Sequence, residues 1–270
     1  MIRWLLLVLF PAGSIAANLE IDQAFNQLYN SDYAAAHSTI DRYTGQHPGD
    51  PLGYAVKAAT YLYSELDRLG VLESDFFESD SRIGDKKKLR PDPRAKEEFE
   101  RASQKSESLA AADLTRDAKD RNALFAMSLS VGERMDYMAL IEKRQLASLS
   151  VNKQAYRYAH RLIQLDPKFY DAYLTTGFTE YVIGDLPAVF RWFVKFDDVQ
   201  GDKAAAIRTL KLVADYGHYL KPLAQIFLAA AYLREKNFGA TQKLLQELTH
   251  DFPANPLLRR ELAKISAKVH

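Results

Sequence analysis

The chain of 270 residues contains no cysteine. This absence excludes disulfide bonds, thiolate zinc sites, a thiol nucleophile and a lipid anchor attached to a cysteine. A chain without cysteine fits an oxidising compartment but does not require one. Any site chemistry must therefore come from carboxylates, imidazoles, hydroxyls, amides and basic side chains.

The chain also lacks an excess of charge of one sign. It carries 36 basic and 35 acidic residues, which gives a formal net charge of +1 at pH 7. No overall field therefore favours nucleic acid or an anionic membrane as a partner. The composition is 47% hydrophobic and 26% charged, so a chain of this length can bury a core. We expect a folded protein that binds no nucleic acid.

Local motifs of catalysis and metal binding are absent from the sequence too. The six histidines form no H-E-x-x-H pattern or other close pair of ligands. The chain contains no G-x-S-x-G elbow, no P-loop and no G-x-G-x-x-G turn. The sequence therefore predicts no catalytic residue, no cofactor and no bound metal.

The first residues of the chain form a separate segment. Arg3 precedes the apolar stretch 4–10, and small residues at 14 and 16 follow Pro11. This order is typical of a secretory signal, and the stretch is shorter than the roughly 20 residues of a membrane span. We predict a signal peptide over residues 1–17, cleaved near Ala16 or Ala17, and a periplasmic or secreted protein. The alternatives are an uncleaved anchor and a buried N-terminal helix. No later stretch is apolar enough for an integral span.

One spacing pattern recurs along the rest of the chain. A small residue is followed by apolar residues four and seven positions later and by proline after twelve, starting at Ala36, at Ala155 and, with threonine in the small position, at Thr241. Offsets of four and seven place side chains on one face of a helix, and a small residue lets a neighbouring helix approach. A second small position, at Ala58 and Gly177, lies ten residues after two of these prolines.

These paired helices with small residues at fixed positions resemble the tetratricopeptide repeat, a helix–turn–helix unit of about 34 residues. The resemblance covers residues 18–255 and is strongest in 18–63 and 155–253. The lengthened units, one with Leu186 and Pro187 after its first helix, resemble a group of exported bacterial tetratricopeptide proteins.

The resemblance implies an all-α fold in which residues 18–270 form a single helical repeat solenoid, a superhelix of about 11–12 helices. A charged helix over 256–268 caps its end. The expected helix pairs are 18–29 with 33–46, 51–69 with 94–115, 119–142 with 147–165, 168–183 with 202–216, and 221–234 with 238–250.

Two units carry insertions. Residues 70–93 are polar and predict a long loop, whose basic cluster at 86–88 is either a solvated tip or an anionic docking site. Residues 186–201 are rich in aromatic side chains and predict either an extra helix over the edge of the solenoid or an exposed partner patch. Nearby, Glu180 occupies a position where the repeat has an aromatic residue. If it is buried, it needs a cation or hydrogen-bond donors, and we favour a structural ion pair over a functional role.

In tetratricopeptide proteins the first helices of the pairs line the concave side, which commonly holds a peptide or a partner helix. Carried over to the fourth and fifth units, this implies partner contacts at Asp171, Leu174, Phe178, Tyr181, Leu223, Ile226, Leu233 and Arg234. This surface is mixed apolar and polar and lacks a clamp of lysine and arginine, so we expect no capture of an acidic C-terminal tail.

The sequence thus favours a non-enzymatic scaffold, exported to the cell envelope, that binds another envelope or secreted protein or a peptide. One alternative is a structural subunit that associates with copies of itself through its edges. A further alternative is a small-ligand binder or an enzyme on a helical solenoid, which would need polar groups that converge in one pocket, such as Glu180 with a histidine and an arginine.

Overall fold

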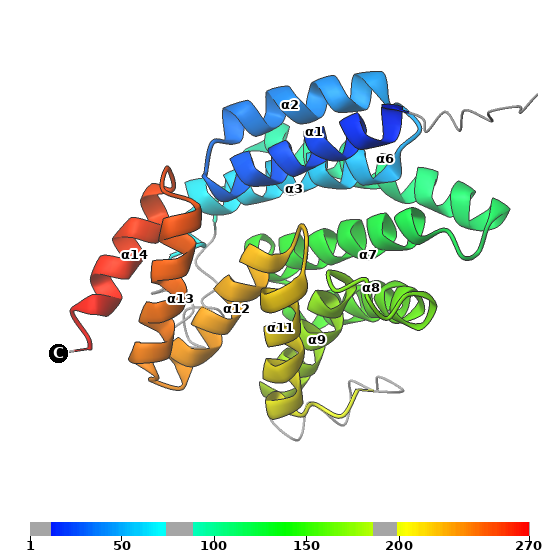
Figure 1. Ribbon diagram of the computed structural model, residues 1–270. Coiled ribbons are helices and arrows are strands. Elements are labelled where there is room, and N and C mark those ends of the chain that lie inside the picture. The colour runs from blue at the N-terminus through cyan, green and yellow to red at the C-terminus, as the bar shows by residue number, and fades with distance from the viewer. Residues whose placement is uncertain (1–11, 74–88, 186–198, 270) are drawn as a thin grey trace, which may run out of the picture.

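The structure is a computed structural model that describes residues 12–73, 89–185 and 199–269, with side chains from residue 19 onward. Within these ranges the chain forms eleven α-helices and one short π-helix, and it contains no strand. Successive helices run antiparallel and pack as pairs, and the pairs stack into a curved solenoid (Figure 1). The predicted all-α helical repeat solenoid is confirmed.

The first helices of the pairs are α1 Ala12–Tyr29, α3 Pro51–Arg68, α7 Arg121–Asp136, α9 Ala172–Asp185 and α12 Lys221–Arg234. The second helices are α2 Tyr33–Gln46, α6 Pro93–Arg116, α8 Gln145–Leu165, α11 Lys203–Tyr216 and α13 Phe238–Asp251. The π-helix Tyr137–Ile141 extends α7, and α14 Pro256–Ser266 closes the chain. The helix α9 starts a few residues later than predicted, because the preceding residues form a turn.

Helix starts follow from local sequence. Several helices begin after an aspartate or asparagine whose side chain accepts hydrogen bonds from the backbone of the first turn, as Asp50 does for α3 and Asp120 for α7. Proline occupies the first positions of α3, α6 and α14, where its missing N–H costs nothing.

The small residues of the repeat pattern lie at helix contacts, as predicted. Ala36, Ala58 and Ala155 are completely buried. A Cβ atom at Gly177 would lie 3.0 Å from the Thr209 side chain of α11. These contacts let the helices of a pair, and neighbouring pairs, approach closely.

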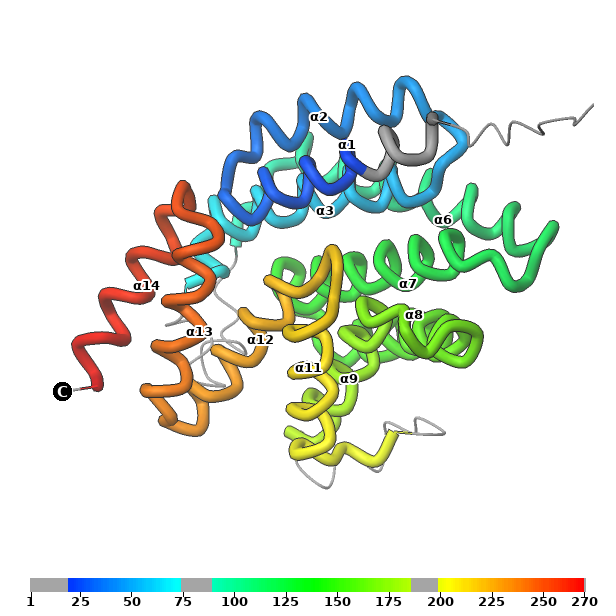
Figure 2. The backbone as a smooth tube through the Cα atoms, in the orientation of Figure 1, coloured from blue at the N-terminus to red at the C-terminus, as the bar shows by residue number. Residues whose placement is uncertain are grey.

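The curvature brings the two ends of the solenoid together. The hydroxyl of Tyr29, at the end of α1, donates a 3.0 Å hydrogen bond to the carbonyl oxygen of Tyr219. The side-chain amide of Asn255, which caps α14, donates a 2.8 Å hydrogen bond to the carbonyl oxygen of Tyr29. The turns before α12 and α14 therefore lie against the first helix pair (Figure 2).

Several predicted segments lie outside the described residues. These are residues 1–11 of the expected signal and most of the two insertions, 74–88 and 186–198. The helix α1 begins at Ala12 and not at the predicted residue 18, so the expected cleavage point near Ala16 falls inside it. Signal cleavage itself stays a prediction. In the described part of the chain, no helix combines the length and the apolar character needed to cross a membrane.

Candidate binding site

Aromatic rings from four segments meet where the solenoid closes. Tyr219, in the turn between α11 and α12, stacks on Phe25 of α1 with ring centres 5.0 Å apart. Its ring also faces Phe125 of α7 at 6.1 Å, and Phe125 packs against Phe169 at 5.0 Å. The rings of Phe125, Phe169 and Tyr219 line a cavity.

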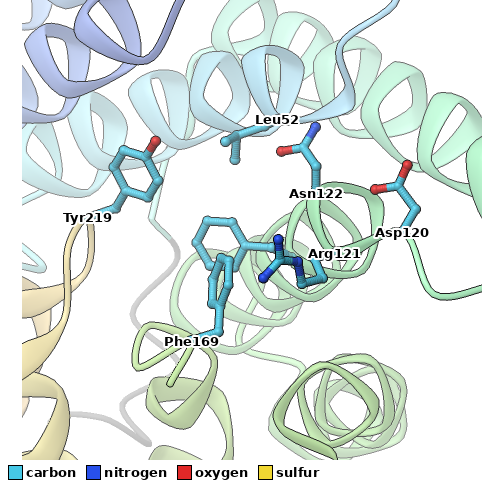
Figure 3. Close-up of a pocket in the computed structure, with 7 residues that line it drawn as sticks. Leu52, Asp120, Arg121, Asn122, Phe169 and Tyr219 are labelled. Carbon is cyan, nitrogen blue, oxygen red and sulfur yellow. The ribbon is translucent and has the colours of Figure 1, made fainter. Parts of the chain in front are cut away.

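The cavity has a volume of about 460 Å³. It lies between the N-terminal ends of α3 and α7, beside the turn before α9 and the turn before α12 (Figure 3). Its lining residues are Leu52, Asp120, Arg121, Asn122, Phe125, Phe169 and Tyr219. The cavity thus combines apolar and aromatic side chains with three polar ones, from the cap of α7 (Asp120) and from its first turn (Arg121 and Asn122).

These polar side chains are held by named partners. Asp120 caps α7 by accepting a 2.9 Å hydrogen bond from the backbone N–H of Ala123. The Arg121 guanidinium forms a 2.7 Å ion pair with Asp166, and the Asn122 amide donates a 2.8 Å hydrogen bond to Asp50. The rim is therefore a fixed polar arrangement, although Arg121 itself is mostly exposed.

Tyr219 is positioned by a buried carboxylate. Asp171 accepts hydrogen bonds from the backbone N–H groups of His218 at 3.0 Å, Tyr219 at 3.3 Å and Leu220 at 2.9 Å. Burial raises the pKa of Asp171, and these three donors oppose that rise. The turn also requires Gly217, because a Cβ atom there would lie 2.6 Å from the Val213 carbonyl oxygen and 3.0 Å from the Asp171 carboxylate.

The electrostatic surroundings of Tyr219 are negative. Burial raises the pKa of its hydroxyl to about 12, and the charges of Asp22, Asp171 and Asp50 add to the rise. Asp22 also contacts the Nε2 atom of His218 at 2.7 Å.

The structure divides the predicted partner residues into two groups. Four are buried, because they hold the turn before α12 or pack between neighbouring helices: Asp171, Leu174, Leu223 and Leu233. Four are half-buried and keep some accessible surface: Phe178, Tyr181, Ile226 and Arg234. The first group therefore presents little side-chain surface to a partner in this conformation.

The half-buried group connects α9 with α12 and α11. Phe178 stacks on Phe227 with ring centres 4.7 Å apart. Arg234 forms a 2.6 Å ion pair with Asp185, and the Tyr181 ring lies 5.5 Å from the Lys203 ammonium. None of these side chains lines the cavity.

Glu180 has a structural environment. Its carboxylate accepts hydrogen bonds from the backbone N–H groups of Gly201 at 2.7 Å, Asp202 at 3.2 Å and Gln200 at 3.3 Å. These donors precede α11, so Glu180 fixes the point at which the chain returns from the insertion. The ion pair favoured by the sequence does not form among the described residues, because backbone donors take its place. In a similar way, the Glu65 carboxylate of α3 fixes the start of α6, because it accepts a 2.7 Å hydrogen bond from the backbone N–H of Asp92.

The cavity residues were not found from the sequence. Phe125 and Leu52 occupy ordinary helical positions, and Tyr219 lies in a turn. The available signal was the segment 216–222, where the pattern expects proline and the chain instead carries a glycine, a histidine and a tyrosine. The role of this segment in the cavity depends on its contacts with α1, which lies almost two hundred residues earlier in the chain.

Within the described residues, no cluster of histidine, aspartate and glutamate has the arrangement of a metal site. Comparison of the chain with known protein families, with curated proteins and with solved structures finds no match.

Proposed function

We propose that this protein is a non-enzymatic scaffold of the tetratricopeptide kind, which binds another protein or a peptide on the inner side of its solenoid. The observation that carries the proposal is the cavity between α3 and α7, each of which is the first helix of its pair. Phe125, Phe169 and Tyr219 line this cavity. A partner side chain that enters an aromatic cavity of this size buries much of its surface. Such central, desolvated contacts supply most of the binding energy of an interface.

Two further features support the proposal. The small residues at the helix contacts match the repeat pattern, and tetratricopeptide proteins commonly bind on the inner side. In addition, Phe178, Ile226 and Phe227 keep accessible apolar surface on α9 and α12. These side chains offer a second contact area for a partner that extends beyond the cavity.

The place of action that we propose is the cell envelope or the exterior. The basis is the N-terminal pattern of Arg3, the apolar stretch 4–10 and the small residues that follow. The partner would then be another envelope or secreted protein.

The test is site-specific photo-crosslinking in native cells. A photoreactive phenylalanine at Asn122, which lines the cavity and is exposed, should give a crosslinked product with a second protein. The same group at Tyr216, which is 62% exposed and does not line the cavity, is the matched control. Absence of a product specific to position 122 would contradict the proposal.

The same experiment separates the alternatives. A product with twice the mass of the chain would favour the subunit that associates with its own copies. A small-ligand binder or enzyme built on Glu180 has less support, because the Glu180 carboxylate is engaged by backbone donors before α11 and does not line the cavity.

A further inference from the structure

The charged groups around the cavity are mostly carboxylates. Asp120 lines it, and Asp50 lies directly behind Asn122 at 2.8 Å from the amide nitrogen. On the Tyr219 side, Asp22 and Asp171 both act on the tyrosine hydroxyl. The aromatic walls therefore stand in a negative field.

Among the described residues that line this cavity, Arg121 is the one cation. It forms a 2.7 Å ion pair with Asp166, which neutralises its charge locally. An incoming carboxylate would have to displace Asp166 and would also meet the charge of Asp120. An incoming cation avoids that competition and meets the carboxylates of Asp120 and Asp50, whose partners are hydrogen-bond donors without charge.

The walls and the field suit the same kind of ligand. The face of an aromatic ring carries partial negative charge and attracts ammonium and guanidinium groups, most strongly where water is excluded. A lysine has a four-carbon stem that packs on apolar surface, while its charged end stays near polar groups. The stem can lie along the rings of Phe169 and Tyr219, which are half-buried and keep accessible surface, and the ammonium would then be directed toward Asp120.

We propose that the cavity binds a lysine side chain of the partner, so that the scaffold selects a basic segment of another protein. This inference rests on the proposed function, because it names the chemistry of the partner at the same site. The cavity then supplies specificity through charge, and the rest of the inner side supplies contact area.

The test uses three small probes with the same backbone and the full mature chain. They are the Nα-acetyl N-methylamides of lysine, norleucine and glutamate, which carry a positive, a neutral and a negative side chain. Binding is followed by the NMR signals of the Leu52 methyl groups and the Phe169 ring. We expect the lysine probe to bind about tenfold more tightly than the norleucine probe, with an affinity that falls as salt is added. Equal or stronger binding of the norleucine or glutamate probe, or no binding of any probe, would overturn the proposal.

Two variants give changes of opposite sign. Asp120→Asn keeps a residue that caps helices well and should weaken binding of the lysine probe about fivefold. Arg121→Gln removes the competing cation and frees Asp166, so it should strengthen binding. If Arg121→Gln instead weakens binding of the lysine probe, the cavity is not selective for cations. Asp202→Asn, the same substitution at the cap of α11, is the matched control and should have no effect.

The outcomes distinguish this inference from the proposed function. A crosslinked partner at Asn122, together with no preference for the lysine probe, would support the proposed scaffold function and contradict the selectivity for a positive charge. Binding of the lysine probe without any crosslinked protein supports the cation site and contradicts the scaffold.

Discussion

The hydroxyl of Tyr29 donates a hydrogen bond to the carbonyl oxygen of Tyr219, 190 residues further along the chain. This bond joins the first helix pair to the turn between the fourth and fifth pairs. The Tyr219 ring stacks on Phe25 on one side and lines the cavity on the other. Closure of the solenoid and formation of the cavity therefore depend on the same residue.

Tyr29→Phe should loosen this closure without removing an aromatic ring. The variant keeps the packing of the ring on Phe252, at 5.4 Å, and leaves the Tyr219 carbonyl without its donor. We expect a loss of about 1 kcal/mol in the free energy of unfolding and faster hydrogen exchange in residues 216–222. Tyr216→Phe, at an exposed ring, is the control. Unchanged exchange rates in that segment would show that the bond does not hold the turn.

Stability should fall as pH rises between about 4 and about 7. Burial raises the pKa of Asp136 to about 7 and raises that of Glu133 well above its ordinary range. Among the residues that the structure describes, neither carboxylate oxygen of Glu133 has a hydrogen-bond partner. In the unfolded chain both groups ionise near pH 4, so the folded state binds more protons across this window and loses stability as they dissociate.

Glu133→Gln should reduce this pH dependence, because the amide stays neutral. Urea unfolding at pH 5 and at pH 8 measures the effect, and the variant should lose less stability between the two values than the parent chain. Glu235→Gln, at an exposed position, should behave like the parent. If the free energy of unfolding changes equally between pH 5 and pH 8 in the parent chain and in Glu133→Gln, this account of the buried carboxylate is wrong.

A side chain at Gly177 should crowd the contact with α11. A Cβ atom there would lie 3.0 Å from Cγ2 and 3.2 Å from Cβ of Thr209, so Gly177→Ala should lower stability, and Gly177→Arg should unfold the protein. Gly132 lies in α7, which like α9 is the first helix of its pair, and a Cβ atom at Gly132 would meet nothing within 4 Å. Gly132→Ala should therefore gain up to about 1 kcal/mol from helix propensity alone. Thermal unfolding compares the two, and equal effects would contradict the packing role of Gly177.

The mature protein should begin near Ala17. Cell fractionation with N-terminal sequencing should recover the chain outside the cytoplasm and without the apolar stretch 4–10. A full-length chain in the cytoplasm would exclude export and, with it, an envelope partner.

The sequence by itself determined the helices and their pairing. The helix α2 spans the predicted residues 33–46, and the small residues Ala36, Ala58 and Gly177 occupy the predicted contacts. Caps, prolines and offsets of four and seven act within a few turns of helix, so the local pattern carries that information.

Only the tertiary structure decided the site. Asp171 and Leu223 follow the repeat pattern of inner-face residues, yet they are buried, because the turn before α12 folds inward against α1. Glu180 finds backbone donors at the far end of an insertion. Contacts such as Tyr29 with Tyr219 depend on the accumulated curvature of the stacked helix pairs, and no spacing within a single unit encodes that curvature.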